Sequence, residues 1–598
     1  MECKANYLSQ LALRLDYSTS RKRRTGPHPA SVGRKLPLSA NVYYLALMGK
    51  TPHVGVIGAG VSGLRCADIL GQNGVKVTIL EARDRIGGRI TQADVGGYSV
   101  DLGANWIHGT EGNPVDQISR ISGTTTCEWD GEETVFDTSG KLLDEATTLK
   151  IAEWMWTTVD KGFDFSTRSK DTIPPEMSLF DFCCQQLEQT DFTAEEKAAC
   201  KEFAKFWGAY VGEPVERQSM KFFCLEECIE GTNLFVASTY KNILSHISQL
   251  ALQRADLCLN SPVVSIQAAK RDLTRDRQIT VTTAGGQKYH FDDVIVTCPL
   301  GWLKKNKSVF NPTLPPRLSS AIDSISYGRL EKIYVSFPRA FWNIPTKHTP
   351  NGGGEMTVVN GSDITLNVNT GHHPPVHTQW LQPDYVKAPS TEGSWNMQCV
   401  SLAALPENCA HPTLLFYIYG PCAAHVVSNI KDLDEASPAY YEFLDDFVRP
   451  FYSLLPGYSN STNCKPTDFL ASKWISDDYA GNGSYSNFQV GLEAGDKDIE
   501  TMRIGVGPDR GIWFAGEHTA PFVGLGTTTG AYWSGERAAG QICDLYSLGQ
   551  LGLGVRKDDS LPMGTNPGVS SGNTMFHKGN NASPRASTTI LATAVESQ

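Results

Sequence analysis

The first sustained hydrophobic pattern of the chain begins near residue 53 and predicts a strand, a helix and a second strand. Residues 53–58 form an apolar run that ends in glycine, which is typical of a strand buried on both faces. Apolar residues at helical spacing follow over 64–70, glycine ends the helix, and a second apolar run covers 75–80. This order indicates a βαβ unit of a parallel sheet.

Three glycine-punctuated segments share this character and are separated by sequence of a different kind. They cover 53–109, roughly 256–302, and 510–543. A helix-rich stretch follows the first segment, and strand-like runs at 332–337 and 414–419 precede the last. Pieces of one domain that alternate with material of another predict a discontinuous two-domain enzyme.

Composition places the chain among globular proteins with more than one domain. Its 598 residues are more than one hydrophobic core usually accommodates. A composition of 40% hydrophobic and 20% charged residues excludes the collagen-like, coiled-coil and wholly disordered classes of protein. No apolar run approaches the ~20 residues of a membrane-spanning helix, so we expect no membrane partner. The fifteen cysteines lack the spacing of a zinc site, which favours free thiols, a reducing compartment and no bound metal.

The net charge of −11 is unevenly distributed. Residues 1–50 hold nine Lys and Arg against two acidic residues, a net of +7, so the remainder carries −18. An acidic body argues against nucleic acid as the main ligand and is compatible with a cationic substrate.

Both ends of the chain are predicted to lie outside the folded region. Residues 1–51 contain a basic run and lack apolar periodicity, so they are either an upstream extension ahead of Met48 in a cytoplasmic protein or a nuclear or mitochondrial signal. Residues 547–598 are rich in Gly, Ser, Asn and Pro and predict a disordered tail. A Gly-, Pro- and His-rich stretch at 343–395 is interpreted as a surface loop or a lid.

The turn after the first strand has the composition of a dinucleotide-binding site. Gly58 permits a tight turn, Gly60 lets the backbone approach a pyrophosphate, and Gly63 lets the helix pack on the strand. The phosphates would lie at the helix N-terminus, and Glu81, at the end of the second strand, would accept hydrogen bonds from a ribose. A glycine turn in an unrelated α/β domain leaves Glu81 without a role, so we favour the nucleotide site.

An arginine- and glycine-rich run follows Glu81 and favours FAD over NAD. Arg83 and Arg89 can supply multidentate phosphate contacts, and Gly88 lets the main chain touch a ligand. A solvated basic loop does not account for the two adjacent glycines that precede Arg89.

At this point the chain resembles the flavin-containing amine oxidase superfamily, and the resemblance continues to residue 543. Val263 matches a valine that contacts adenine, Glu517 lies in a "FAGE" motif whose glutamate holds the ribityl region, and Thr527 and Thr528 open the helix that receives the flavin pyrimidine. The resemblance implies an α/β fold: a Rossmann-like FAD-binding domain of the glutathione-reductase/amine-oxidase type with a discontinuous α+β substrate-binding domain.

The resemblance also divides the chain. The FAD-binding domain is expected at 52–115, 245–330 and 466–546, and the substrate-binding domain at 116–244 and 331–465.

For catalysis, the resemblance implies one lysine. The family passes hydride from the carbon next to nitrogen to the flavin, and a lysine usually holds a water beside the flavin N5. Lys332 lies on the matching strand. An apolar pocket should depress the pKa of its ammonium, and the alternative is an edge-strand lysine that faces solvent.

Tyr485 occupies the position of one wall of the family's aromatic cage, and the opposing position falls near Thr527. Half a cage is typical of polyamine oxidases and lysine demethylases rather than monoamine oxidases. Ser484 stands where monoamine oxidases carry the cysteine that bonds the flavin, so we expect non-covalent FAD.

Two further features resemble the polyamine and spermine oxidase branch. His108 lies in a Trp-Ile-His-Gly sequence, where the resemblance places it near flavin and substrate; a histidine packed in the core is the alternative. Glu226, or failing it Glu227, matches a carboxylate for a distal ammonium, although a solvated acidic helix face fits the same residues.

The sequence therefore predicts an FAD-dependent oxidase of polyamines (spermine, spermidine or N-acetylated forms) that uses O2 and releases H2O2. The alternatives are a histone lysine demethylase, an oxidase of another secondary amine in specialised metabolism, and, from a different class, a flavin-bearing binding or regulatory protein without turnover. The sequence is silent on oligomeric state.

Overall fold

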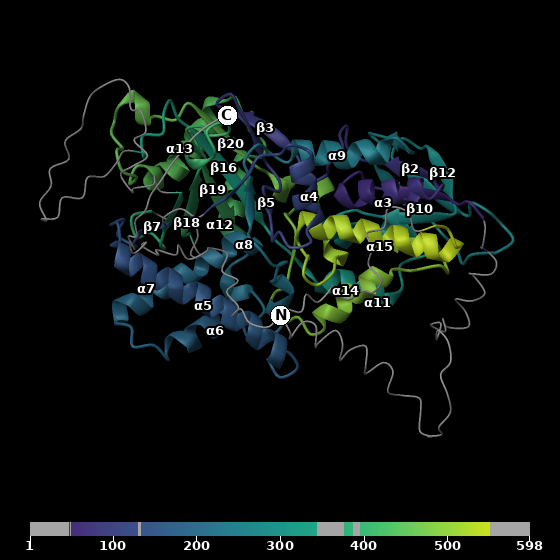
Figure 1. Ribbon diagram of the computed structural model, residues 1–598, viewed down its shortest axis with the longest axis horizontal. Helices are drawn as coiled ribbons and strands as arrows, with labels where there is room; N and C mark the ends of the chain where they lie inside the picture. Colours follow the sequence, from purple (N-terminus) through teal and green to yellow (C-terminus); the bar gives the residue numbers. More distant parts are fainter. Residues whose placement is uncertain (1–46, 48–49, 130–132, 344–375, 387–394, 550–598) are drawn as a thin grey trace, which may run out of the picture.

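The computed structural model describes residues 47, 50–129, 133–343, 376–386 and 395–549. Almost all of the expected N-terminal extension and C-terminal tail, and most of the 343–395 stretch, lie outside the described residues. The described part is elongated and consists of two lobes that lie side by side (Figure 1).

The first lobe is built on a five-stranded sheet in which every neighbouring pair is parallel. Its strands are buried on both faces, as the near-continuous apolar runs predict. The predicted βαβ unit is thus confirmed. From edge to edge the strands are β22 (Ile512–Phe514), β13 (Asp293–Val296), β1 (His53–Ile57), β2 (Lys76–Leu80) and β9 (Ala255–Cys258).

Different layers cover the two faces of this sheet. Three helices pack together on one face: α3 (Val61–Gln72), α9 (Lys241–Leu252) and α15 (Thr528–Tyr546). The other face packs on a four-stranded sheet and on α10 (Leu300–Lys305), α11 (Pro316–Ser324) and α14 (Gly495–Ile504). The four-stranded sheet runs β12 (Lys288–Phe291), β11 (Ile279–Thr283), β10 (Val263–Gln267) and β14 (Phe310–Asn311).

The second lobe is built on a six-stranded sheet. Its neighbours are antiparallel except for the last pair, which is parallel. The predicted strands at 332–337 and 414–419 are confirmed as two neighbouring strands of this sheet, the second and the third in order. In order the strands are β20 (Asp468–Ala471), β16 (Leu330–Ser336), β19 (Thr413–Tyr419), β18 (Met397–Ser401), β17 (His377–Trp380) and β7 (Glu133–Phe136).

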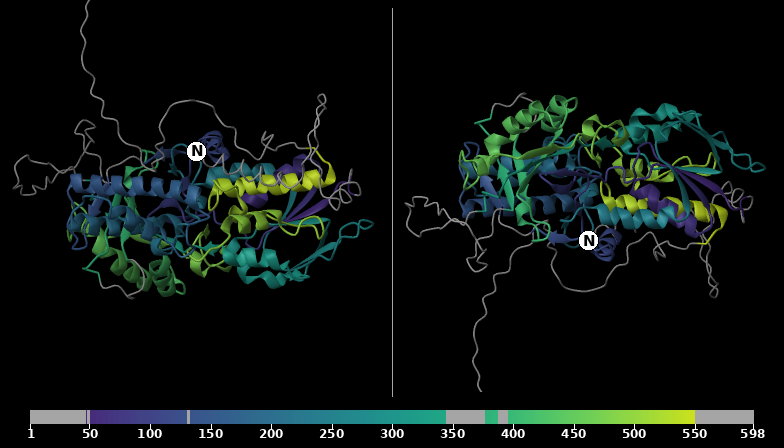
Figure 2. Two further views of the ribbon diagram at one scale, coloured as in Figure 1. Left: turned by 90° about the horizontal axis from the view of Figure 1, so that it is seen from below. Right: turned by 90° about the horizontal axis from the view of Figure 1, so that it is seen from above.

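Two sets of helices cover the six-stranded sheet. One face packs on α12 (Gly420–Ile430) and α13 (Pro438–Tyr452). The other face is turned toward α5 (Glu145–Ser169), α6 (Leu179–Leu187), α7 (Ala194–Ala204) and α8 (Gly208–Val211). In Figure 2 these blue helices and the yellow α15 of the first lobe lie at opposite ends of the long axis.

Short strands connect the two lobes around the site. A three-stranded sheet pairs residues near 107 with residues near 235, a hairpin covers 92–101, and a two-stranded pairing joins residues near 327 and 486. They are β5 (Trp106–Ile107) with β8 (Leu234–Val236) and β6 (Thr126–Glu128), β3 (Gln92–Val95) with β4 (Tyr98–Asp101), and β15 (Ser326–Tyr327) with β21 (Ser486–Asn487). A further helix, α4 (Pro114–Ile121), contacts α9 and α15.

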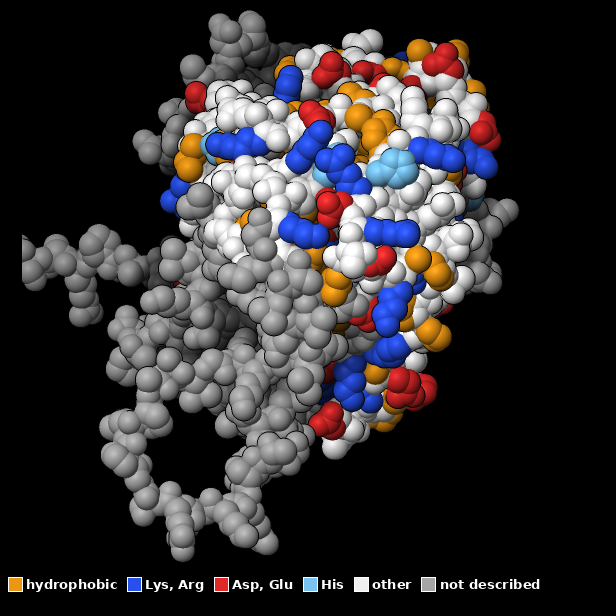
Figure 3. All heavy atoms as spheres, turned by 90° about the vertical axis from the view of Figure 1, so that its right-hand side faces the viewer, with side chains coloured by type: hydrophobic (Ala, Val, Ile, Leu, Met, Phe, Trp, Pro, Cys, Tyr) orange, Lys and Arg blue, Asp and Glu red, His pale blue; other side chains and the backbone are white. Residues whose placement is uncertain are grey.

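The outer end of the first lobe has a mixed surface. Figure 3 shows Lys and Arg side chains lying among Asp and Glu side chains on this face. Opposite charges that alternate within a Debye length largely cancel, so this face presents no large single-sign field. Within the described ranges, no helix has both the length and the apolar character needed to cross a bilayer. The expected domain boundaries stay a prediction.

Candidate active site

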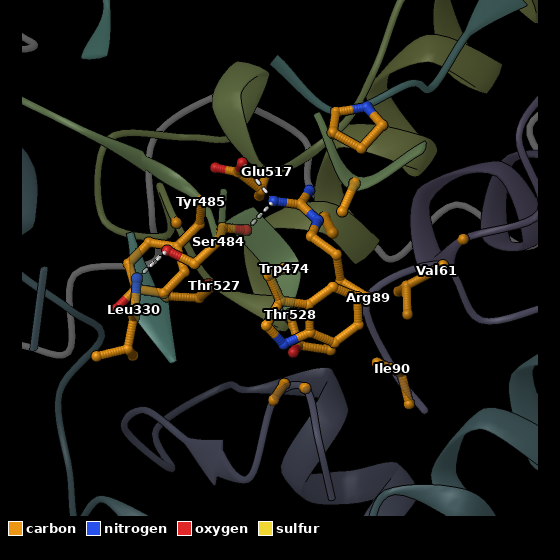
Figure 4. Close-up of a pocket in the computed structure, with 18 of the residues that line it drawn as sticks. Val61, Arg89, Ile90, Leu330, Trp474, Ser484, Tyr485, Glu517, Thr527 and Thr528 are labelled. Atoms are coloured by element: carbon orange, nitrogen blue, oxygen red, sulfur yellow. Dashed lines mark hydrogen bonds and ion pairs between the residues drawn. The ribbon is translucent and has the colours of Figure 1, made fainter. Parts of the chain in front are cut away.

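A cavity of about 390 Å³ runs between the lobes and brings most of the predicted site residues together (Figure 4). Two predicted residues are absent from its lining, Gly63 and Glu227. Lining residues that the sequence predicted are Gly58, Gly60, Glu81, Arg83, Gly88, Arg89, His108, Glu226, Val263, Lys332, Tyr485, Glu517, Thr527 and Thr528.

The glycine turn at the start of α3 is shaped to receive a phosphate. Gly58 has φ +108°, and a Cβ at Gly63 would lie 2.1 Å from the Gly58 carbonyl oxygen, so helix and turn pack too closely for a side chain. A Cβ at Gly60 would meet no described atom within 4 Å, which leaves open space above the helix start. Among the described residues no side chain caps α3. Its first N–H groups can therefore bind an anion.

Glu81 is held by the backbone beside this turn. Its Oε2 accepts the Ala59 N–H at 2.7 Å and its Oε1 accepts the Arg83 N–H at 2.9 Å. Each carboxylate oxygen keeps a further lone pair, which can accept a hydroxyl. The Ser261 N–H donates to the Glu81 carbonyl at 2.8 Å and brings the segment before Val263 to the same end of the cavity. These residues fit the sugar and base of a nucleotide.

The two predicted arginines have different surroundings. Arg83 donates to both carboxylate oxygens of Asp477 at 2.8 Å, and its guanidinium lies 5.5 Å from the Tyr479 ring centre. Asp477 is a residue that sequence reasoning missed. An acidic partner fixes the direction of Arg83 at the cavity wall, so its contact with a phosphate stays a prediction.

Arg89 lies at the centre of the site (Figure 4). Its Nη1 donates to the Ser484 carbonyl at 2.7 Å and to Glu517 Oε1 at 3.1 Å. Ser486 donates its hydroxyl to the other carboxylate oxygen of Glu517 at 2.6 Å. Burial alone would raise the pKa of Glu517, but the charge of Arg89 and these hydrogen bonds hold it below its ordinary value. Glu517 is therefore an ionised carboxylate inside the protein.

The N-terminus of α15 opens onto the cavity. Thr527 is the N-cap: its Oγ1 accepts the Gly530 N–H at 2.9 Å and donates to the Gly524 carbonyl at 2.8 Å. Helix geometry leaves the N–H groups of Thr528 and Thr529 outside this cap, and they can donate to a polarised carbonyl. The hydroxyl of Thr527 is thus already engaged in capping, and its predicted contact with substrate stays a prediction.

Lys332 extends from β16 of the second lobe toward the first lobe. Its Nζ donates to the carbonyls of Asp101 at 3.0 Å and Gly103 at 2.5 Å, and the side chain is 4% exposed. Burial lowers the pKa of Lys332 to about 7, against the opposing charge of the nearby Asp101. Two donors are held by the backbone, so the third position of the amine can address a water in the cavity. The structure thus supports the direction of the pKa shift that the sequence predicted for Lys332.

Tyr485 and His108 contribute two walls. The Tyr485 hydroxyl donates to the Tyr210 carbonyl at 2.5 Å, which fixes the ring in the cavity. Burial lowers the pKa of His108 to about 4, so its imidazole is neutral at physiological pH. Its Nδ1 is buried and has no hydrogen-bond partner among the described residues. A ligand group can therefore bond to it.

Of the two candidate carboxylates, the structure places only Glu226 at the cavity. Its Oε1 accepts the Phe488 N–H at 3.3 Å and the Gln218 amide at 3.4 Å. Burial raises the pKa of Glu226 to about 8. Glu227, one residue further, is not part of the lining.

Ser484 lies next to Tyr485 at the junction of the lobes. Its Oγ accepts the Leu330 N–H at 3.2 Å (Figure 4). Neighbouring residues that sequence reasoning missed include Tyr417, whose hydroxyl accepts the Asn105 amide at 2.8 Å, and the polar residues His377 and Gln398.

Comparison with known proteins gives one family. The sequence profile described as "Flavin containing amine oxidoreductase" matches residues 61–543. "Probable polyamine oxidase 4" of Arabidopsis thaliana is 30% identical over 302 residues, 49% of this chain and 59% of that protein. "Polyamine oxidase 4" of Oryza sativa subsp. japonica is 27% identical over 522 residues, 84% and 90% of the two chains. "Lysine-specific histone demethylase 2" of Homo sapiens is 27% identical over 527 residues, which are 85% of this chain and 55% of that protein. The chain thus spans less than two thirds of the Arabidopsis and human proteins.

The pairing of Arg89 with Glu517 predicts a stability effect. Replacement of Glu517 by Gln leaves the partly buried guanidinium of Arg89, whose side chain is 24% exposed, without its counter-charge. It should lower the free energy of unfolding by about 1.5–3 kcal/mol, the range of a hydrogen bond to a charged group. Because the folded pKa of Glu517 is lowered, the contribution is present above the ordinary carboxyl pKa and is lost as the pH falls through the lowered value. Urea unfolding of both proteins at pH 7 and at lower pH measures it.

The matched control is Asp164→Asn, which breaks an ion pair with Arg168 whose side chains are 60% and 64% exposed. Its cost should stay below about 1 kcal/mol, since solvent screens exposed pairs. Equal effects of the two substitutions would show that the Arg89 pair contributes no more than a surface contact.

Proposed function

Because the chain belongs to the flavin-containing amine oxidoreductase family, we propose that it is an FAD-dependent oxidase of polyamines, acting on a secondary amine of spermine, spermidine or their N-acetylated forms. The observation that carries the proposal is the position of Lys332. A buried lysine of the second lobe donates to the carbonyls of Asp101 and Gly103, and it lines the same cavity as the glycine turn and Glu81 on the one hand and Tyr485, His108 and Glu226 on the other.

The residues of the cavity fit FAD. The open N-terminus of α3 and the space above Gly60 suit a pyrophosphate, and the held carboxylate of Glu81 suits a ribose diol. When bound, FAD accepts hydride from the carbon next to the amine nitrogen and returns the electrons to O2 as H2O2, so that with water the amine yields an aldehyde and a smaller amine.

The protein's own residues prepare the amine for this chemistry. A nitrogen must be uncharged to release hydride from its neighbouring carbon. Burial favours the uncharged forms of both His108 and Lys332, and the same low-dielectric surroundings favour an uncharged substrate nitrogen. The Tyr485 ring orients the substrate. Glu226, ionised when it meets a cation, pairs with a second nitrogen of the polyamine.

An amine panel tests the proposal. Purified full-length protein loaded with FAD should release H2O2 with spermine, spermidine or N1-acetylspermine, and the flavin absorbance should bleach under anaerobic conditions. Peroxidase-coupled detection measures the first effect and spectroscopy the second. Bleaching only with a methylated histone peptide would favour a demethylase, and no bleaching with any amine would favour a flavin-bearing binding protein.

Replacement of Lys332 by Met tests the lysine. The substitution keeps the length of the side chain and removes the amine whose third position would hold a water, so flavin reduction or reoxidation should slow by about 10²–10⁴-fold while FAD stays bound. Stopped-flow absorbance measures both half-reactions. Lys473→Met is the control, since Lys473 pairs with Glu435 at the surface and does not line the cavity. Unchanged rates in Lys332→Met would remove the role.

We further propose that FAD is held without a covalent bond. The Ser484 hydroxyl accepts a backbone N–H and is a weak nucleophile, and burial raises the pKa of the Cys298 thiol, which also lines the cavity. Acid precipitation should therefore release the yellow colour into the supernatant. Colour that stays with the pellet, traced to a peptide by mass spectrometry, would contradict this binding mode.

A further inference from the structure

Asp101, the last residue of β4, makes hydrogen bonds to both lobes. Its carbonyl oxygen accepts the Lys332 amine at 3.0 Å and the Tyr334 hydroxyl at 2.6 Å, and both donors belong to β16. Its carboxylate accepts the Gln92 side-chain amide at 2.6 Å and, at the start of α9, the Tyr240 N–H at 2.9 Å. The residue is 4% exposed. Asp101 therefore ties the direction of the Lys332 amine to the first lobe.

The Lys332 amine can carry three hydrogens or two, and this number determines how it binds a water. Two of its positions donate to the carbonyls of Asp101 and Gly103, which are acceptors in either case. A protonated amine offers an N–H donor at the third position, whereas an uncharged amine offers a lone pair. Burial disfavours the charged form, so a protonated amine needs a counter-charge nearby.

The carboxylate of Asp101 is such a counter-charge. Burial lowers the pKa of Lys332, and the charge of Asp101 opposes this fall more than that of Glu331 does. Burial raises the pKa of Asp101, and the Gln92 amide, the charge of Lys332 and the Tyr240 N–H oppose the rise. Each of the two groups thus stabilises the charged form of the other.

The other titratable groups close to the amine differ from this carboxylate. Glu331 precedes Lys332 on β16, so its side chain leaves the opposite face of the strand, and its carboxylate accepts hydrogen bonds from the segment 472–475. The ring centre of Tyr417 lies 5.9 Å from the Lys332 Nζ, and burial raises the pKa of its hydroxyl to about 12. Burial also raises the pKa of the Tyr334 hydroxyl. Both tyrosines are therefore uncharged near neutral pH.

We propose that Asp101 is the positioning residue of Lys332: its carbonyl fixes the direction of the amine, and its carboxylate keeps the third hydrogen on the nitrogen. Asp101 is not part of the cavity lining, whereas Lys332 is, so Asp101 acts through the lysine and not on the substrate. The inference rests on the proposed function and specifies what makes the lysine a hydrogen-bond donor to the water.

The test is the pH profile of the half-reaction that Lys332→Met slows, measured by stopped-flow absorbance with spermine and the FAD-loaded full chain. The relevant limb of the profile is the one that Lys332→Met lacks. Asp101→Asn removes the negative charge and favours the uncharged amine, so the midpoint of this limb should fall by at least about one pH unit. Gln92→Met removes a hydrogen bond that favours the ionised carboxylate, and should move the midpoint in the same direction by less.

Asp94→Asn is the matched control. Asp94 lies on β3 of the same hairpin, but its side chain is exposed and its charge is screened by solvent. Its midpoint should equal that of wild type. A wild-type midpoint in Asp101→Asn would overturn the inference.

A double-mutant cycle separates the counter-charge from the contact with Tyr240. Loss of that contact should cost the same whether or not Lys332 is present, whereas loss of the counter-charge matters only when it is. Asp101→Asn should therefore lower the apparent Tm in wild type by at least about twice as much as in Lys332→Met. Equal decreases, or failure of Asp101→Asn to fold in both backgrounds, would overturn the inference. The cycle needs no substrate, so a wild-type protein that no amine reduces would overturn the proposed function and not this coupling.

Discussion

The site depends on the ion pair between Arg89 and the buried carboxylate of Glu517. Arg89 joins a loop of the first lobe to Ser484 and Glu517, which lie 395 and 428 positions further along the chain. A buried charge is tolerated only when it is paired and hydrogen-bonded, so the carboxylate of Glu517 requires that these segments meet. The α15 N-terminus and the Tyr485 ring both follow closely on the paired residues, which is why they reach the same cavity.

Lys332 likewise depends on contacts between segments that are distant in the sequence. It belongs to the six-stranded sheet, but its amine donates to the carbonyls of Asp101 and Gly103, at the end of the β3–β4 hairpin that connects the lobes. Without this segment the amine would lose both partners. The catalytic half of the cavity is therefore a property of the assembled molecule, and its low dielectric follows from that assembly.

Burial shifts three ionisable groups of the cavity toward their uncharged forms: the pKa falls for Lys332 and His108 and rises for Glu226. Glu517 is the exception, because Arg89 holds its pKa below the ordinary value. A ligand that carries a positive charge favours the ionised form of Glu226, whereas it does not favour the charged form of Lys332. The arrangement therefore suits a molecule with an uncharged nitrogen at one point and charged nitrogens elsewhere, as a polyamine has.

The local pattern of apolar residues and glycines was sufficient to predict the strand–turn–helix unit and the position of Glu81. It also predicted the strands that carry Lys332 and Tyr417. Such elements can be predicted because hydrophobic periodicity and glycine spacing are properties of a few consecutive residues. Tertiary structure alone decided which of Glu226 and Glu227 reaches the cavity, gave Arg83 its partner Asp477 and used the Thr527 hydroxyl as a helix cap. The reason is physical: strand register and lobe packing bring together residues hundreds of positions apart, and no local spacing in the sequence encodes such a contact.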